Sequence, residues 1–323
     1  MYKICFVVHR YAPYQGGSEL FIQALAEECV KQGHSVTVYT NQHKGNLNGV
    51  NVTSDHNILL EQFNIIVVHG GNCISQDTVH MNSHIIKSPI LYMLILPSTS
   101  VSCMTGLKNC EYIGCSTEAD WEHVRKFDML FKAHYIRHSV PNNKLTIGIP
   151  NIFRNKYNIP YDKKMLLSCG GYWQHKGMIE LANIVNIIDK QDIILVLTGY
   201  NDDQLSRPQD SDKVKTFLIE DKEDIAHAMA DMDLYIMNST EEGYGLVLIE
   251  TMLNKKPWIS RNIAGAIKMK DYGLLYETQE ELQNYLINLD NTINSIDIEK
   301  GYTYAMNNHL TQHTVADILK LIT

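Results

Sequence analysis

The stretch NSTEEGYGLVLIE, residues 238–250, contains the pattern that decides the fold and the chemistry of this chain. It follows the apolar run 234–237, which is typical of a buried strand, and it leads through a Gly-Tyr-Gly turn into an apolar helical segment at 246–253. The first backbone N–H groups of a helix have no partner inside the helix, and the helix dipole is positive at that end. The pattern therefore predicts a phosphate-binding helix N-terminus.

Two glutamates flank the predicted phosphate site. Glu242 stands directly before the turn, and Glu250 lies one to two turns into the helix. A carboxylate does not bind phosphate, but it accepts hydrogen bonds from hydroxyl groups, so the two acids suit the hydroxyls of a sugar. The spacing alone leaves an equally good alternative, in which a glycine turn precedes a core helix and both glutamates are solvated.

Strands that are apolar throughout alternate with amphipathic segments on both sides of this stretch. Such alternation predicts parallel sheets that helices cover on both faces. In the first half of the chain the expected strands are 2–8, 35–39, 64–68, 90–96 and 112–115, and the expected helices are 18–31, with Ser18 as N-cap and Gly33 just past the end, and 117–126.

The pattern lapses around residues 141–158 and then restarts. In the second half the expected strands are 165–169, 193–197, 214–219, 234–237 and 257–260, and the expected helices are 176–190, 222–230, 246–253, 280–289 and one near 309–321. The expected fold class is therefore α/β, with two Rossmann-like domains facing each other across a ligand-binding cleft. The expected domains are 1–150 and 151–304, and the helix at about 305–323 is a candidate to pack back on the first.

Composition limits the classes of function. The chain has 323 residues, 45% of them hydrophobic, and a formal net charge of −8, which argues against general nucleic-acid binding. Its seven cysteines include no CxxC pair, as expected of free thiols in a reducing compartment. The first residues lead into a strand and not a secretory signal, and no apolar run approaches the ~20 residues that span a bilayer. We expect a soluble, cytoplasmic protein.

Several common catalytic motifs are missing from the sequence. It has no G-x-G-x-x-G after the first strand, no G-x-x-x-x-G-K-[ST] and no H-E-x-x-H, which argues against dehydrogenases, P-loop kinases and zinc proteases of those classes. Asp231-Met-Asp233 spells D-x-D, a metal-binding pattern elsewhere, but here it joins a helix end to a strand start. We expect these acids to be structural and predict no metal site.

The stretch 238–250 resembles the E-G-[FY]-G-x-x-x-x-E signature of the retaining glycosyltransferases of family 4, which have the GT-B fold. The resemblance runs in the right order over nearly the whole chain. It includes the glycine loop before the first long helix, the following G-H-S-V-T-V, the strand and helix at 111–126, the I-P-N element at 149–151, the K-G turn within 167–177 and the strand at 230–239.

The resemblance implies a nucleotide-sugar site without a cofactor, with a UDP-sugar, and a UDP-hexose in particular, as co-substrate. Glu242 and Lys176 would be its catalytic residues. The donor-binding residues would be Gly16, Gly17, Lys176, Glu242, Gly243, Tyr244, Gly245, Leu246 and Glu250.

Each of these residues has a role that the resemblance implies. Glu250 would bind the donor ribose, and Glu242 with the backbone of the Gly-Tyr-Gly turn would hold the transferred sugar and part of the diphosphate. Lys176 would neutralise the diphosphate as it leaves, without a metal ion. Gly16 and Gly17 would let their loop approach the diphosphate, because they carry no side chain.

The sequence departs from the family at two places. Gly171 stands where the family usually has an arginine, five residues before Lys176, and Tyr172, His175 or Arg261 are candidates to compensate. The family often has a histidine near the sugar, after the strand equivalent to 90–96. Here Ile95 or Leu96 occupies that place, and His69 on a neighbouring strand end is a less favoured substitute.

The run 123–138 is basic and interleaved with apolar and aromatic residues. Such a stretch could contact anionic lipid, a phosphorylated acceptor or a nucleic-acid backbone. We favour the simpler interpretation, a partly buried helix with a solvated basic face.

The sequence thus predicts a glycosyltransferase (a hexosyltransferase) that acts with retention and without metal on an acceptor hydroxyl. The acceptor is left open between glycan, lipid, small molecule and modified nucleic acid. Three alternatives stay open: a non-catalytic nucleotide-sugar-binding protein, a nucleotide-sugar epimerase, and a transferase acting on a modified nucleic acid base.

Overall fold

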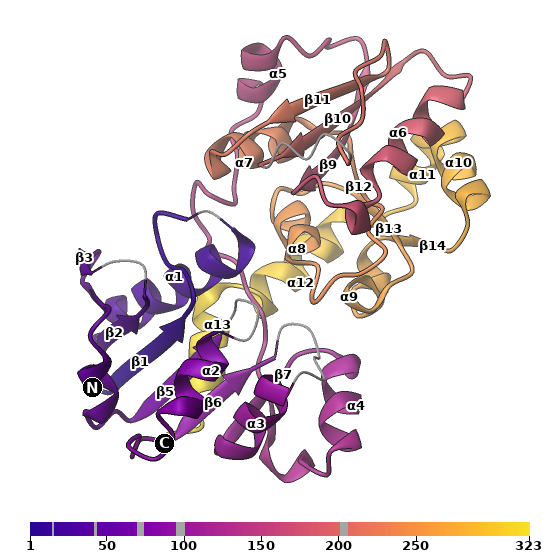
Figure 1. The fold of residues 1–323 in the computed structure, drawn as a ribbon. Coiled ribbons are helices and arrows are strands. Elements are labelled where there is room, and N and C mark those ends of the chain that lie inside the picture. Colours follow the sequence, from indigo (N-terminus) through magenta and orange to yellow (C-terminus); the bar gives the residue numbers. More distant parts are fainter. Residues whose placement is uncertain (15, 42–43, 70–73, 95–100, 201–205) are drawn as a thin grey trace. The chain divides into compact units, whose positions relative to one another are not determined.

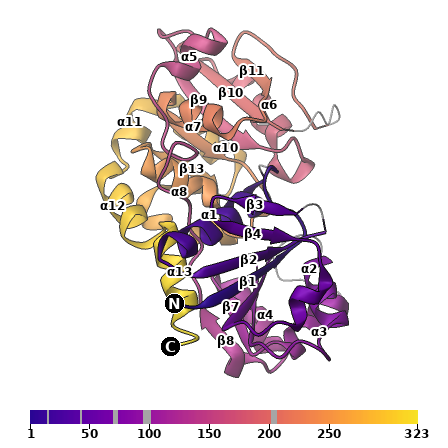
Figure 2. The same ribbon diagram turned by 90° about the vertical axis from the view of Figure 1, so that its left-hand side faces the viewer.

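The computed structural model describes residues 1–14, 16–41, 44–69, 74–94, 101–200 and 206–323. The chain forms two compact units (Figures 1 and 2). The first comprises residues 1–141 and 309–323, and the second comprises 142–308. Both units contain a mainly parallel sheet between helices, as the α/β class requires.

The sheet of the first unit has the strand order β3-β4-β2-β1-β5-β6-β7-β8. All neighbours pair in parallel except β3 and β4. The strands are β1 Lys3–Val8, β2 Ser35–Tyr39, β3 Gly45–Leu47, β4 Val50–Thr53, β5 Ile65–His69, β6 Ile90–Met93, β7 Tyr112–Cys115 and β8 Ala133–Tyr135. The helices are α1 Gly17–Lys31, η1 His56–Leu60, α2 Ile74–Met81, α3 Val101–Asn109, α4 Glu118–Lys126, η2 Leu130–Lys132 and α13 Thr311–Leu319.

The central strand β1 is buried on both faces of this sheet. Ile4 and Phe6 belong to the core that contains α1 and α13 residues, whereas Cys5 and Val7 belong to the core on the other face. Successive side chains of a strand point to opposite faces, so an uninterrupted apolar run serves two cores. This explains why the strands of this chain lack an apolar–polar alternation.

Helix α1 begins earlier than the sequence suggests. Its N-cap is Gly16, in an extended conformation, and not Ser18. A Cβ atom on Gly16 would come within 2.3 Å of the Glu19 carboxylate, so a larger residue there would have to displace that flexible side chain. The helix ends as expected, with Gly33 at a φ of +85°.

The basic run 123–138 is not one helix, so that expectation is wrong. Helix α4 begins after Thr117, which forms a capping box with Asp120, and ends at Lys126. Asp128 then takes a φ of +55°, which breaks the helix before η2 and β8.

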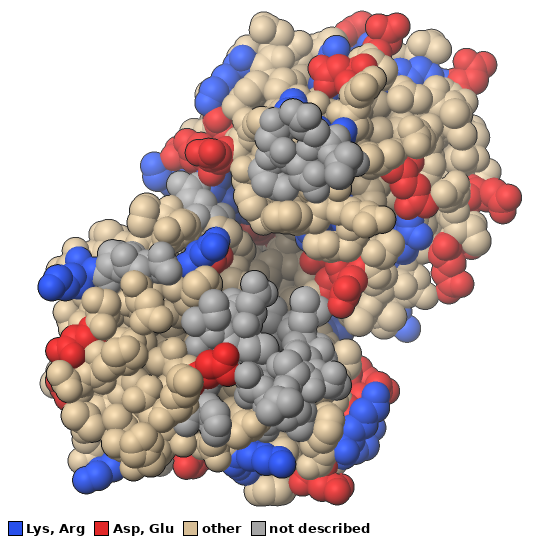
Figure 3. Space-filling view, viewed as in Figure 1, with Lys and Arg blue, Asp and Glu red and all other residues tan. Residues whose placement is uncertain are grey.

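The turn after α4 exposes a group of large apolar side chains, which we call the aromatic turn. Its members are Phe127, Leu130, Phe131 and Tyr135, and Phe131 is 79% exposed. Basic side chains lie over α4 on the face that Figure 3 shows, with acidic side chains close by. The run is therefore partly exposed, as expected, and its buried residues are His123, Val124, Met129, Ile136 and His138.

Helix α13 joins residues far apart in the sequence. It packs beside α1, and in Figure 1 its yellow ribbon lies among the indigo and magenta elements of the first unit. Arg137 binds Asp317 in two hydrogen bonds, Nε to Oδ2 at 2.6 Å and Nη2 to Oδ1 at 2.7 Å. Burial opposes the ionised form of Asp317, but the hydrogen bonds from Arg137 outweigh it and hold the pKa of that carboxyl below its ordinary value.

The sheet of the second unit is parallel throughout, in the order β11-β10-β9-β12-β13-β14. The strands are β9 Lys164–Gly170, β10 Ile193–Gly199, β11 Val214–Leu218, β12 Leu234–Met237, β13 Trp258–Arg261 and β14 Leu274–Tyr276. The helices are α5 Ile152–Tyr157, η3 Gln174–Lys176, α6 Met178–Ile187, α7 Lys222–Asp231, α8 Leu246–Leu253, α9 Ala264–Ile267, η4 Lys270–Tyr272, α10 Gln279–Ile287, α11 Leu289–Asn294 and α12 Ile298–Asn308.

This order places the first strand of the unit, β9, in the middle and beside the fourth, β12. It is the 3-2-1-4-5-6 order of the Rossmann fold, whose winding direction reverses between the first and fourth strands. The expected helix 176–190 is interrupted at Gly177, because a φ of +64° separates η3 from α6. None of the helices in the described ranges has both the length and the apolar character that a membrane crossing requires.

The Arg137–Asp317 pair gives a test of how α13 is held. The D317N variant should lose about 2–3 kcal/mol of unfolding free energy, because it leaves the partly buried Arg137 without its charged partner. E61Q is the matched control, since Glu61 pairs with Lys3 at an exposed site and should change stability by less than about 1 kcal/mol.

Urea denaturation at several pH values measures both variants. The folded carboxyl of Asp317 has a lowered pKa, so its contribution is complete above the unfolded value and disappears as the pH falls through the folded value. Equal losses for D317N and E61Q at neutral pH would show that this ion pair does not hold α13.

Candidate functional site

The candidate site lies where β9 and β12 end in the second unit. The chain leaves β9 through residues 171–176 and leaves β12 through residues 238–245, so both loops start from the same edge of the sheet. The two loops touch, because the Thr240 amide donates to the carbonyl oxygen of His175 at 2.8 Å. In a parallel sheet the reversal of winding separates the connections at this edge and leaves room for a ligand.

The two loops are held together by a close approach at Gly177. A Cβ atom there would lie 2.5 Å from the carbonyl oxygen of Asn238. The buried Asn238 side chain donates to the carbonyl oxygen of Gly177 at 2.8 Å and accepts hydrogen bonds from Arg261 and Tyr276. Only a glycine allows this contact, which explains the K-G sequence of the turn.

The two predicted catalytic residues meet at this edge. Lys176 Nζ lies 2.5 Å from Glu242 Oε1, and the Ser239 hydroxyl donates to the same oxygen at 2.8 Å. Both charged side chains are about one-fifth exposed, at 20% and 17%. Within the described ranges no group donates to Glu242 Oε2, so that oxygen can accept a hydrogen bond from a ligand.

Helix α8 begins beside this pair. Its N-cap Gly245 has a φ of +76°, and its first hydrogen bond runs from the Leu248 amide to the Gly245 carbonyl at 2.9 Å. The amides of Leu246 and Val247 precede that bond, and no acceptor for them exists in the described part of the chain. The predicted anion-binding helix start is thus formed as the Gly-Tyr-Gly pattern requires.

Glu250 is paired with Lys222, a residue that the sequence analysis did not single out. Lys222, the first residue of α7, lies with Nζ 2.7 Å from Glu250 Oε1 and 2.8 Å from Oε2. Burial works against the charged lysine, but the nearby Glu250 carboxylate outweighs it, so the pKa of Lys222 is raised. The sequence signal was a lysine in the first turn of a helix, where the helix dipole disfavours a cation.

The thiol of Cys169 is influenced by residues of both lysine–glutamate pairs. Burial raises its pKa to about 11, while Lys222 and Lys176 both act to lower it and Glu250 acts to raise it. The backbone amide of Cys169 donates a hydrogen bond to the Tyr235 hydroxyl oxygen at 3.3 Å. Lys176 and Lys222 are therefore close enough to one thiol for both to influence its ionisation.

The candidates to replace the missing arginine are not equivalent. Gly171 is buried. Tyr172 is buried and bonds the carbonyl oxygens of Leu197 and Phe217, and Arg261 binds Glu180 and Asn238. These contacts give Tyr172 and Arg261 structural roles, and His175 is exposed.

The remaining predicted residues lie in the first unit. Gly16 and Gly17 stand at the start of α1, and their donor contacts stay predictions that the sequence resemblance carries. His69 ends β5, is buried against Phe21 and His138, and has its pKa lowered to about 3 by burial, which makes it a neutral core residue. Ile95 and Leu96 lie outside the described residues.

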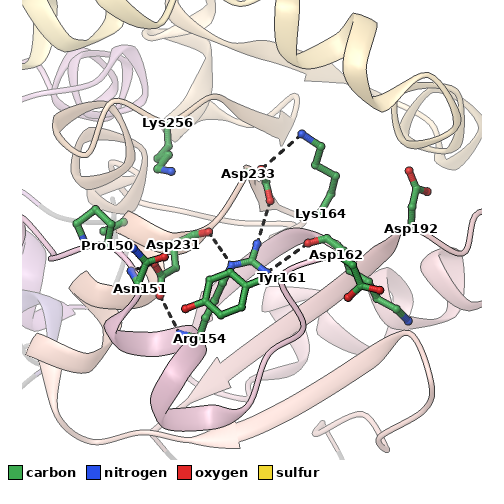
Figure 4. A pocket seen from close by; sticks show the side chains of 12 residues that line it. Pro150, Asn151, Arg154, Tyr161, Asp162, Lys164, Asp192, Asp231, Asp233 and Lys256 are labelled. Carbon is green, nitrogen blue, oxygen red and sulfur yellow. Dashed lines mark hydrogen bonds and ion pairs between the residues drawn. The ribbon is translucent and has the colours of Figure 1, made fainter.

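A separate pocket of about 390 Å³ lies at the opposite edge of the second sheet, where β9 and β12 begin (Figure 4). It contains the D-x-D acids, and both are engaged. Asp231 accepts hydrogen bonds from the amides of Asn151 and Arg154, and Asp233 accepts from the Met165 amide at 2.7 Å and from the Arg154 guanidinium at 3.1 Å. These carboxylates fasten α5 to the sheet, which supports the structural interpretation of D-x-D.

Residues 163–291, which lie within the second unit, match the family model described as glycosyl transferases group 1. No curated protein matches the sequence.

Solved structures similar to the whole chain add to this match. They include HepE from Anabaena in complex with UDP-glucose, at a TM-score of 0.80 and 16% identity, covering 100% of this chain and 99% of that one. Sucrose-phosphate synthase from Thermosynechococcus elongatus matches at 0.76 and 15%, covering 99% and 98%. The catalytic domain of starch synthase IV from Arabidopsis thaliana, bound to ADP and acarbose, matches at 0.72 and 12%, covering 99% and 98%.

At these identities the structural likeness establishes the fold, and the family match bears on the activity. The described helices and strands form two Rossmann-like units, as in GT-B proteins. With a group 1 glycosyltransferase domain in its second unit and the GT-B fold over its length, this chain is a glycosyltransferase.

Proposed function

We propose that the chain transfers a hexose from a UDP-hexose to an acceptor hydroxyl, with retention and without a metal ion. The observation that carries the proposal is the pair of lysine–glutamate contacts beside the open start of α8, at the edge where β9 and β12 diverge. The UDP-glucose and UDP complexes of the similar protein HepE support a uridine nucleotide. Retention is supported by the family 4 signature in the sequence.

Each side chain has a proposed contact with the donor. The Glu250 carboxylate accepts hydrogen bonds from the ribose hydroxyls, and Glu242 accepts them from the sugar hydroxyls through Oε2. The amide of Leu246 and the backbone of residues 243–245 contact the diphosphate. Lys176 lies beside the leaving oxygens and gives up part of its contact with Glu242 as the donor binds.

The proposed reaction needs no group beyond donor, acceptor and these residues. The acceptor oxygen forms a bond to the anomeric carbon on the face from which the diphosphate departs. The bond from that carbon to the phosphate oxygen breaks, and its electron pair stays on the diphosphate. The acceptor proton passes to the departing phosphate, whose growing charge is stabilised by Lys176 and the positive end of α8.

Two further features belong to the proposal. The first domain, residues 1–150, is the proposed acceptor side, and 151–304 the proposed donor side. The free thiols of Cys5, Cys29, Cys110, Cys115 and Cys169 support a reducing compartment, and we propose the cytoplasm.

Replacing each of the two glutamates should impair a different property, nucleotide binding for Glu250 and turnover for Glu242. E250A should weaken UDP binding about tenfold or more, because the ribose hydroxyls lose an ionised acceptor. E242A should leave UDP binding nearly unchanged and lower turnover of UDP-glucose by at least about tenfold. Calorimetry measures binding, and UDP release measures turnover. E241A is the matched control, since Glu241 is exposed next to Glu242.

Each contrary result has a definite meaning. Wild-type behaviour of both E250A and E242A would remove these residues from the site. Tight UDP binding by the unaltered chain, with neither transfer nor hydrolysis over a panel of acceptors, would favour a non-catalytic binding protein.

Chelation tests the absence of a metal from the mechanism. Activity should survive EDTA within about twofold, because a lysine and helix amides supply the positive charge near the diphosphate. The measurement is UDP release before and after dialysis against EDTA, with Mn²⁺ added back. A strict requirement for Mn²⁺ would contradict the proposed mechanism.

The aromatic turn is the proposed contact with an anionic surface. F131S should reduce sedimentation with vesicles of anionic lipid several-fold, because it removes the most exposed apolar side chain beside basic residues. L60S is the control, since Leu60 is 54% exposed in η1, away from this run. Equal sedimentation of both variants, or equal binding to neutral vesicles, would speak against this contact.

A further inference from the structure

Lys222 occupies a position that helix electrostatics disfavour. It is the first residue of α7, whose N-cap Asp221 accepts from the Glu223 amide. Acidic residues are the ordinary choice in this turn, and Glu223 and Asp224 follow it. The position therefore has to be explained by something outside α7.

That explanation is Glu250 on α8. The Lys222 ammonium lies almost equally far from both carboxylate oxygens, at 2.7 and 2.8 Å, so one cation contacts both oxygens of Glu250. The side chains are 17% and 11% exposed. An ion pair this shielded from water holds the carboxylate in one orientation.

The same lysine adds a second cation to the edge of the sheet where the donor is proposed to bind. Gly171 stands where the family resemblance leads us to expect an arginine, and Arg261 is committed to Glu180 and Asn238. Lys176 is paired with Glu242. The influence of both Lys176 and Lys222 on Cys169 shows that Lys222 belongs to the same group of side chains.

We propose that Lys222 is a positioning residue for the donor ribose: it fixes the plane of the Glu250 carboxylate, so that the remaining lone pairs of its oxygens accept from the 2′- and 3′-hydroxyls. The ligand class that follows is a ribonucleoside diphosphate, preferred over its 2′-deoxy form. This inference rests on the proposed function of Glu250.

The alternative is a salt bridge that only stabilises the packing of α7 against α8. The two roles predict different effects on nucleotide affinity. A structural salt bridge changes the affinities for UDP and 2′-deoxy-UDP in proportion, whereas a positioning lysine changes the ratio between them.

The experiment compares K222M with the unaltered chain. We measure the dissociation constants of UDP and 2′-deoxy-UDP by calorimetry, after thermal unfolding has shown that both proteins are folded. UDP should bind roughly tenfold or more weakly to K222M, as expected for the loss of charge assistance at an acceptor, and 2′-deoxy-UDP much less so. K144M is the matched control, because Lys144 pairs with Glu223 of the same helix at an exposed site.

The outcomes separate the two levels of the proposal. If the unaltered chain binds neither UDP nor UDP-glucose, the proposed function fails, and this inference with it. If it prefers UDP to 2′-deoxy-UDP and K222M keeps the same ratio between the two affinities, only the role of Lys222 is overturned. Should K222M not fold, K222Q gives the same readings, because it keeps a hydrogen-bond donor without the charge.

Discussion

The second unit depends on one constraint, the reversal of winding between β9 and β12. Connections on the two sides of that point leave the sheet in opposite directions, which separates the described loops at the edge between them. Lys176 follows β9, Glu242 follows β12, and the start of α8 lies beside both. The contact between Gly177 and Asn238 then fixes how far apart the two loops can be.

Most of the strand framework could be predicted because it depends on local patterns. The apolar runs at 35–39, 112–115 and 234–237 are strands with the predicted bounds, and α8 has the predicted bounds as well. Errors arose where backbone conformation overrides side-chain pattern. Asp128 breaks the basic run and Gly177 divides the helix after β9, in both cases through a positive φ. Short elements such as β3, β4, β8 and β14, and the short helices α2, α3, α5, α9 and α11, are too brief for a clear periodicity. Helix α12 was missed although it is amphipathic.

The candidate site was foreseen in part for the same reason. Glu242 and Glu250 belong to one short motif, so their spacing places both near the helix start. The partners of these acids come from distant segments, 66 residues away for Lys176 and 28 for Lys222. The family resemblance supplied Lys176. The only sequence signal for Lys222 is a cation in the first turn of a helix, and its pairing with Glu250 depends on two helices that the fold brings together.

The return of α13 has a consequence for how the chain is made. The first unit comprises residues 1–141 and 309–323, and its core includes Val315 and Ile318. A ribosome that has produced the whole of its sheet has therefore not yet produced the helix that covers α1. This unit stays incomplete while the second unit is being synthesised, and its uncovered apolar face must remain protected from aggregation during that interval.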